Sequence, residues 1–187
     1  MMNAQLEFRN NIARLMLRDL AAMRREVEQY PNDESLWKAI PGLTNAGGNL
    51  VLHVAGNIQH FVGKVLGESD FVRNRDAEFI KRGLTRAQLV KELEHTISEV
   101  TRTFSTLSAS KLEGIFPQDV NGNHIPTDTF LVHLISHLGY HLGQVDYHRR
   151  CATGDATTIG TMSLPALLLQ FPPITQHESG NMKLPVL

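Results

Sequence analysis

The chain has 187 residues, of which 42% are apolar and 20% are charged, a composition typical of one globular domain with a substantial core. Its formal net charge is −1 and both signs are mixed along the chain, so no basic face favours a nucleic-acid partner. The chain has a single cysteine, Cys151, so an intramolecular disulfide is excluded. It contains no run of about 18 apolar residues that would predict a membrane span. We therefore expect a cytoplasmic protein.

Four segments in the chain carry apolar residues at every third or fourth position. This period predicts amphipathic helices over residues 4–30, 48–66, 85–107 and 127–151. Pro31 should end the first helix and Gly67 the second. Thr85 with Gln88 has the form of a capping box at the start of the third, and Thr127 is the predicted N-cap of the fourth.

The segments between these helices are longer than minimal turns. Residues 32–48 are predicted to hold at most one short helical turn, and the charged residues 68–83 are predicted to loop over the surface. Asn121-Gly122 predicts a tight hairpin turn before the last helix. After the last helix the chain becomes rich in proline. Together these features predict an all-α four-helix bundle, residues 1–152, with long connectors and an extended C-terminal tail, residues 153–187, packed on it.

The chain holds nine histidines, and four of them lie in the last predicted helix: His133, His137, His141 and His148. Helical residues four apart lie on one face, about 6 Å apart along the axis, so two such imidazoles can bind one metal ion. His133 and His141 are about 12 Å apart along the axis, so they cannot share an ion. Spacing therefore leaves two overlapping pairs open, His133 with His137 and His137 with His141.

A third ligand must come from another helix. His53 is the best candidate because it lies beside the apolar stripe of the second predicted helix. His60 lies on nearly the same face but two turns away, so only one of these two histidines can meet a given level of the last helix. These residues predict a metal site between the second and the fourth helices.

Other site chemistries fit the sequence poorly. Leucines follow His133 and His137 where an HExxH zinc peptidase needs glutamate. A di-iron carboxylate bundle needs two Glu-x-x-His motifs, and only Glu92 to His95 matches. Cys151 lies at the end of a helix without an activating partner. We therefore expect Glu92, His95 and Cys151 to take no part in the site.

Residues 137–144, HLGYHLGQ, resemble the HxxxHxGQ signature of the DinB-like (YfiT-like) superfamily of metal-binding helical bundles. Residues 49–57 resemble the second-helix motif that carries the first histidine of that superfamily, and residues 71–79 and 144–150 resemble an uncharacterised subfamily. By motif position the resemblance implies His53, His137 and His141 as the metal ligands, in place of His133. It also implies a homodimer.

Three neutral imidazoles leave a divalent ion with an open position, as in catalytic zinc sites. At that position the ion can activate water or a low-molecular-weight thiol. The superfamily includes thiol-dependent transferases and isomerases, as well as proteins labelled hydrolases. The resemblance thus implies a metal-dependent enzyme acting on a small-molecule substrate. The alternative is a non-catalytic metal-binding or stress-response protein that works through a protein partner.

The sequence determines the identity of the ion and the residues around its ligands less closely than the ligands themselves. Zinc or nickel is expected, with iron and manganese as alternatives, because all four accept imidazole ligands. Asn57 and Gln144 lie four and three residues after predicted ligands, so each could accept a ring N–H or contact a substrate. Arg73 and Arg75 could hold an anionic substrate, but a solvated loop is the expectation for both.

Overall fold

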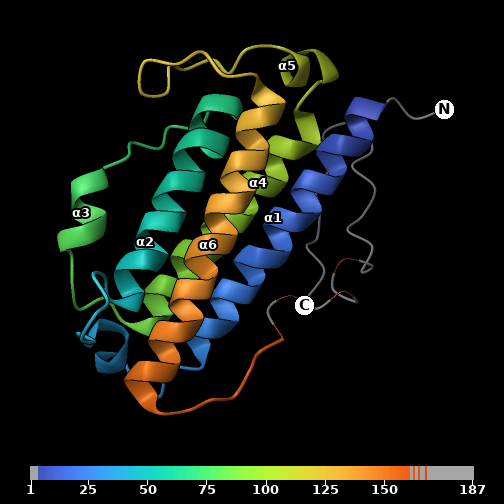
Figure 1. Cartoon of the computed structure of the whole chain (residues 1–187). Helices are drawn as coiled ribbons and strands as arrows, with labels where there is room; N and C mark the ends of the chain where they lie inside the picture. Colours follow the sequence, from blue (N-terminus) through green and yellow to red (C-terminus); the bar gives the residue numbers. More distant parts are fainter. Residues whose placement is uncertain (1–3, 161, 163, 165–166, 168–187) are drawn as a thin grey trace.

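The computed structural model describes residues 4–160, 162, 164 and 167 of the chain. Four long helices run side by side (Figure 1). They are α1 (Ala4–Glu28), α2 (Gly47–Ile58) with its π-helical continuation (Gln59–Leu66), α4 (Arg86–Thr106) and α6 (Thr127–Thr153). A 3-10 turn (Glu34–Trp37), α3 (Arg75–Ile80) and α5 (Ala109–Glu113) are short, and the described residues form no strand. The predicted all-α bundle is confirmed.

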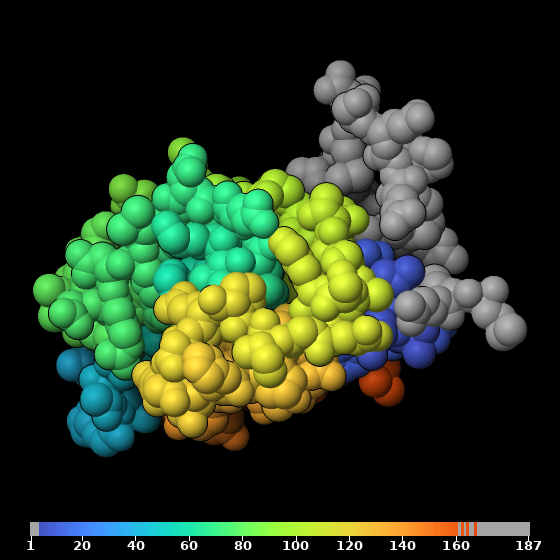
Figure 2. Space-filling view, turned by 90° about the horizontal axis from the view of Figure 1, so that it is seen from above, coloured from blue at the N-terminus to red at the C-terminus, as the bar shows by residue number. Residues whose placement is uncertain are grey.

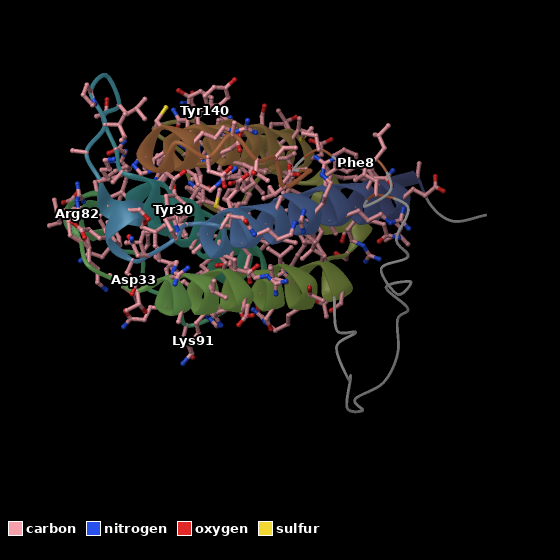
Figure 3. All side chains as sticks on the ribbon, turned by 90° about the horizontal axis from the view of Figure 1, so that it is seen from below. Phe8, Tyr30, Asp33, Arg82, Lys91 and Tyr140 are labelled. Carbon is pink, nitrogen blue, oxygen red and sulfur yellow. The ribbon has the colours of Figure 1, made fainter. Side chains whose placement is uncertain are left out.

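The core lies between the long helices because each turns its apolar stripe inward. α1 packs against α4 and α6, and α2 packs against α4, α6 and the short α3. Fully buried side chains from all four helices meet there, among them Met16, Leu20, Val54, Leu93 and Leu138. Burial of each such side chain contributes about 1.5–3 kcal/mol, so these stripes supply most of the driving force for bundle formation. Tyr30 lies within this packing whereas Tyr140 and Lys91 point outward (Figure 3).

Local signals placed several boundaries correctly. The capping box is present, because the Thr85 side chain accepts from the Gln88 backbone N–H and the Gln88 side chain accepts from that of Thr85. Asn121 and Gly122 have φ values of 54° and 81° and close a turn between Val120 and Asn123. The segment from α5 to α6 that carries this turn covers one end of the bundle (Figure 2).

Three local predictions were incomplete or wrong. Residues 68–83 contain α3, which begins because the Asn74 side chain accepts a hydrogen bond from the Ala77 N–H. The helix α5 was not predicted, since five residues are too short to show a period. Thr127 is not the N-cap of α6 but its first helical residue, because its N–H is bonded to Gly114 O and the Pro126 carbonyl accepts from Phe130. The predicted packing of the tail lies mostly outside the described residues and stays a prediction.

Close packing at the start of α2 gives a test of the fold. A Cβ on Gly48 would lie 2.6 Å from the Trp37 ring, which is held by its hydrogen bond to Leu84 O. We expect Gly48→Ala to lower the free energy of unfolding by about 1–3 kcal/mol. The matched control is Gly139→Ala in α6, where a Cβ meets nothing within 4 Å and should stabilise the helix by about 0.5–1 kcal/mol. Equal urea midpoints for the two variants would contradict this packing.

Candidate metal centre

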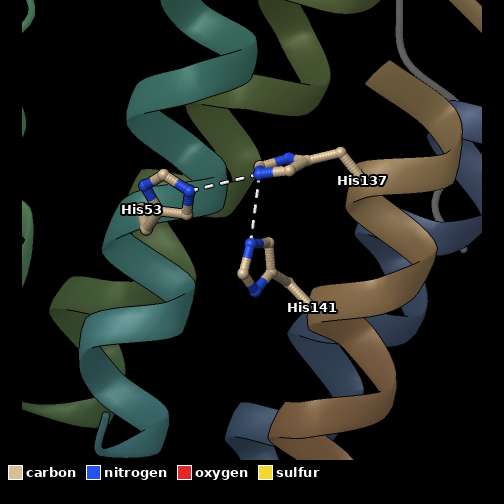
Figure 4. Close-up of side chains that lie close together, drawn as sticks. All are labelled: His53, His137 and His141. Carbon is tan, nitrogen blue, oxygen red and sulfur yellow. Dashed lines mark hydrogen bonds between the residues drawn. The ribbon is translucent and has the colours of Figure 1, made fainter. Parts of the chain in front are cut away.

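Three histidines meet between α2 and α6, and their rings point toward one another (Figure 4). The Nε2 atom of His137 lies 3.3 Å from Nε2 of His53 and 3.1 Å from Nε2 of His141. One ring nitrogen from each of the three residues lies within 4.8 Å of the other two. His53 is buried, whereas His137 and His141 are half-buried. The tertiary structure therefore brings together the three residues that the sequence motifs implied.

The protonation of these rings favours a cation over hydrogen bonds among them. Nδ1 of His53 faces a carboxylate oxygen of Glu78 at 2.9 Å, and Nδ1 of His141 faces the amide oxygen of Gln144 at 2.7 Å. Both oxygens only accept hydrogen bonds, so both Nδ1 atoms carry the proton and both Nε2 atoms present lone pairs. His137 has one Nε2 and cannot donate a full hydrogen bond to both. Two lone pairs that face a third imidazole nitrogen fit a shared cation.

Two of the separations between these nitrogens also fit an ion. Imidazole ligands lie 2.0–2.1 Å from zinc, so two ligands in a tetrahedral site are about 3.3 Å apart. The observed separations of 3.3 Å and 3.1 Å match that value closely. Burial lowers the pKa of His137 to about 4, helped by the neighbouring His141 and His53, and burial also lowers the pKa of His141. Both rings are therefore neutral at pH 7, the form that binds metal.

The structure also separates these three histidines from the alternatives. The ring of His133 stacks on Phe130 and lies 6.1 Å from the His137 ring, so its nitrogens stay outside the cluster. His60 bonds to Gln118 near the end of the bundle. Glu92, His95 and Cys151 are exposed, as expected. Of the two pairs that helical spacing left open, only His137 with His141 reaches His53.

One residue at the site, Glu78, was missed by the sequence analysis, and the prediction for another, Arg73, was wrong. Glu78, on α3, is buried and bonds to His53, while Arg73 holds the Glu78 carboxylate with its Nε at 2.7 Å and its Nη2 at 2.9 Å. The expectation that Arg73 is solvated is wrong, since its side chain is 11% exposed. Both residues lie within the motif 71–79, which was the available signal. Arg75 is exposed, as expected, and lies over the Phe79 ring.

Glu78 is an ionised carboxylate despite its burial. Burial alone would raise the pKa of its carboxyl group. Hydrogen bonds from His53 and Arg73, together with the Arg73 charge, outweigh burial and hold that pKa below its ordinary value. A negative charge therefore lies directly behind the Nδ1 proton of His53, on the far side of the ring from the cluster.

Gln144 and Asn57, the two other residues that the sequence suggested for the site, make different contacts. Gln144 accepts from the His141 ring, which orients that imidazole. Asn57 is buried one turn after His53, but Glu78 takes the His53 proton, and the Asn57 Oδ1 atom has no hydrogen-bond partner among the described residues. That either side chain supports a bound metal or contacts a substrate stays a prediction.

A helical bundle with three histidines between the second and the last of its long helices has the architecture expected of the DinB-like class. A family model described as Mycothiol-S-transferase matches residues 12–154, from the first half of α1 to the residue after α6. The chain therefore belongs to the mycothiol-S-transferase family. A search of curated proteins and a search of solved structures returned no match. Among the described residues, no helix is both long and apolar enough to cross a membrane.

Proposed function

We propose that this protein is a metal-dependent S-transferase that joins a low-molecular-weight thiol to a small electrophilic substrate. The observation that carries the proposal is the convergence of three imidazole Nε2 atoms on one point between α2 and α6. The family match supports the choice of a thiol over water as the nucleophile, and the name of the family supports mycothiol as that thiol. Zinc or nickel is the expected ion.

Each residue of the cluster has a defined part in this proposal. His53, His137 and His141 would hold the ion, and Gln144 would orient the ring of His141. A divalent ion bound there would supply a Lewis acid and would make a thiol that binds beside the three histidines more acidic. The thiol loses its proton to solvent, its sulfur forms a bond to the electrophilic carbon, and the leaving group departs with the electron pair of the broken bond.

The donor set favours an enzyme over the non-catalytic alternative. The described residues offer three metal-ligating side chains at this point, and structural zinc sites are normally closed by four. The half-buried rings of His137 and His141 leave their side of the cluster partly accessible. The expected homodimer and cytoplasmic location stay predictions from the resemblance and the composition.

Thiol binding can be tested without knowing the electrophile. The full chain is loaded with Co²⁺ and titrated with mycothiol, and we expect a near-ultraviolet band that reports contact between sulfur and cobalt. S-methyl mycothiol, which has no acidic proton, is the matched control and should give no band. Turnover of a panel of electrophiles should then depend on both the metal and mycothiol. A loaded protein that shows neither the band nor thiol-dependent turnover would support the non-catalytic alternative.

A further inference from the structure

We propose that Glu78 and Arg73 are positioning residues of the metal centre. Glu78 fixes the tautomer and orientation of His53, and Arg73 holds the Glu78 carboxylate against the His53 ring. The inference rests on the proposed metal centre. Neither residue belongs to the three-histidine cluster, and each has a separate task.

The first task follows from the contact between Glu78 and His53. The Glu78 oxygen Oε2 lies 2.9 Å from Nδ1 of His53, and both side chains are more than nine-tenths buried. A carboxylate at this place keeps the proton on Nδ1, which leaves the Nε2 lone pair for the metal. Loss of such a partner typically weakens metal affinity by 10- to 100-fold.

The second task follows from the contacts of Arg73. Its Nε donates to Oε1 at 2.7 Å and its Nη2 donates to Oε2 at 2.9 Å, so one planar guanidinium binds both carboxylate oxygens. Oε2 therefore accepts from both Arg73 and His53. Because Arg73 binds both oxygens, the carboxylate keeps the orientation that places Oε2 beside Nδ1 of His53.

The backbone of α2 and α3 is built around this carboxylate. A Cβ on Gly56 would overlap Oε1 of Glu78, so only glycine at this position lets the carboxylate approach α2 so closely. The fully buried side chain of Asn49 donates to Glu78 O at 2.8 Å and to Lys81 O at 3.0 Å, which ties α3 to the start of α2. Glu78 is thus held at its backbone by Asn49 and at its carboxylate by Arg73.

Zinc competition titrations on the full chain test the first task. We expect the dissociation constant for Zn²⁺ to rise 10- to 100-fold in Glu78→Ala. It should rise less in Glu78→Gln, whose amide oxygen can still accept from His53. Gly56→Ala should resemble Glu78→Ala, although it changes no charge, because it displaces the carboxylate. Gly139→Ala, where a Cβ meets nothing within 4 Å, is its matched control and should leave the dissociation constant unchanged.

The same zinc titrations test the second task. Arg73→Met removes both hydrogen bonds to the carboxylate, and we expect it to raise the dissociation constant for Zn²⁺ by roughly 10-fold. The control is Arg75→Met, whose guanidinium lies over Phe79 and makes no hydrogen bond to Glu78, and whose dissociation constant should match wild type.

The two proposals can fail separately. Wild-type protein that binds no stoichiometric ion overturns the proposed function and this inference with it. One ion per chain, with unchanged zinc affinity in folded Glu78→Gln and Gly56→Ala, overturns the inference on Glu78 alone. Unchanged zinc affinity in folded Arg73→Met overturns the task given to Arg73. Thermal unfolding of each metal-free variant identifies any variant that loses the fold. Glu78→Gln keeps the shape of the side chain, so it remains a test if the other variants do not fold.

Discussion

His137→Ala is expected to abolish stoichiometric metal binding and, with it, thiol transfer. His137 is the central residue of the cluster, since its Nε2 atom contacts Nε2 of both His53 and His141. Structural zinc sites with four ligands bind with about 10–16 kcal/mol, so loss of one of three ligands should weaken binding by roughly 10²–10³-fold. Elemental analysis of protein purified without a histidine tag, followed by zinc competition titration, measures the effect.

His133→Ala is the matched control, because it removes a histidine one turn away on the same helix. The structure places the His133 ring on Phe130 and outside the cluster, so this variant should keep one ion per chain with unchanged affinity. Equal losses in the two variants would show that the ion lies elsewhere on α6. A wild-type level of metal in His137→Ala would mean that His53 and His141 alone account for binding, contrary to the geometry.

Arg149→Met is expected to cause the largest loss of stability. The Arg149 guanidinium is fully buried and bonds to the equally buried Glu26 of α1 through Nε. It also donates to the backbone of the segment that follows α6, at Thr157 O. Removal of one partner of a buried ion pair costs about 3–5 kcal/mol because it leaves the other charge unpaired. For a chain of this size, that corresponds to a fall in Tm of roughly 6–20 °C.

The loss in Arg149→Met should depend on pH. Burial raises the pKa of Glu26, and Arg149 opposes that shift, so the variant should raise this pKa further. An acid whose pKa is raised in the folded state adds stability below its unfolded pKa, and that stability is lost as pH rises. The variant should therefore be closest to wild type near pH 4.5 and furthest from it near pH 8, as urea unfolding at the two pH values would show.

Two variants separate the buried pair from ordinary charge effects. Arg150→Met removes a neighbouring arginine whose ion pair with Asp146 is partly exposed, and we expect a loss below about 1 kcal/mol. Glu26→Gln combined with Arg149→Met removes both buried charges and should recover part of the loss. If Arg150→Met costs as much as Arg149→Met, burial is not the source of the effect.

The long helices and the pair formed by His137 and His141 could be predicted from the sequence because both depend on residues close together in the chain. Helical period, capping residues and an interval of four residues are local properties that survive without tertiary contacts. The family motif then selected His53, His137 and His141 from among the candidates. Local reasoning alone left His133 and His60 as alternatives. The choice depends on the level at which α2 and α6 meet, and His53 and His137 are 84 residues apart in the chain.

Only the tertiary structure decided what surrounds the cluster and where the buried charges lie. The six residues of α3 are too few to show a period, and the contact between Glu78 and His53 exists only because Gly56 leaves room for a carboxylate beside α2. Arg149 has the sequence appearance of a surface residue near the end of a helix, yet it is fully buried against Glu26. Local free energies set which segments become helices. The balance between removing a charge from water and pairing it with a distant partner is decided only when the helices pack.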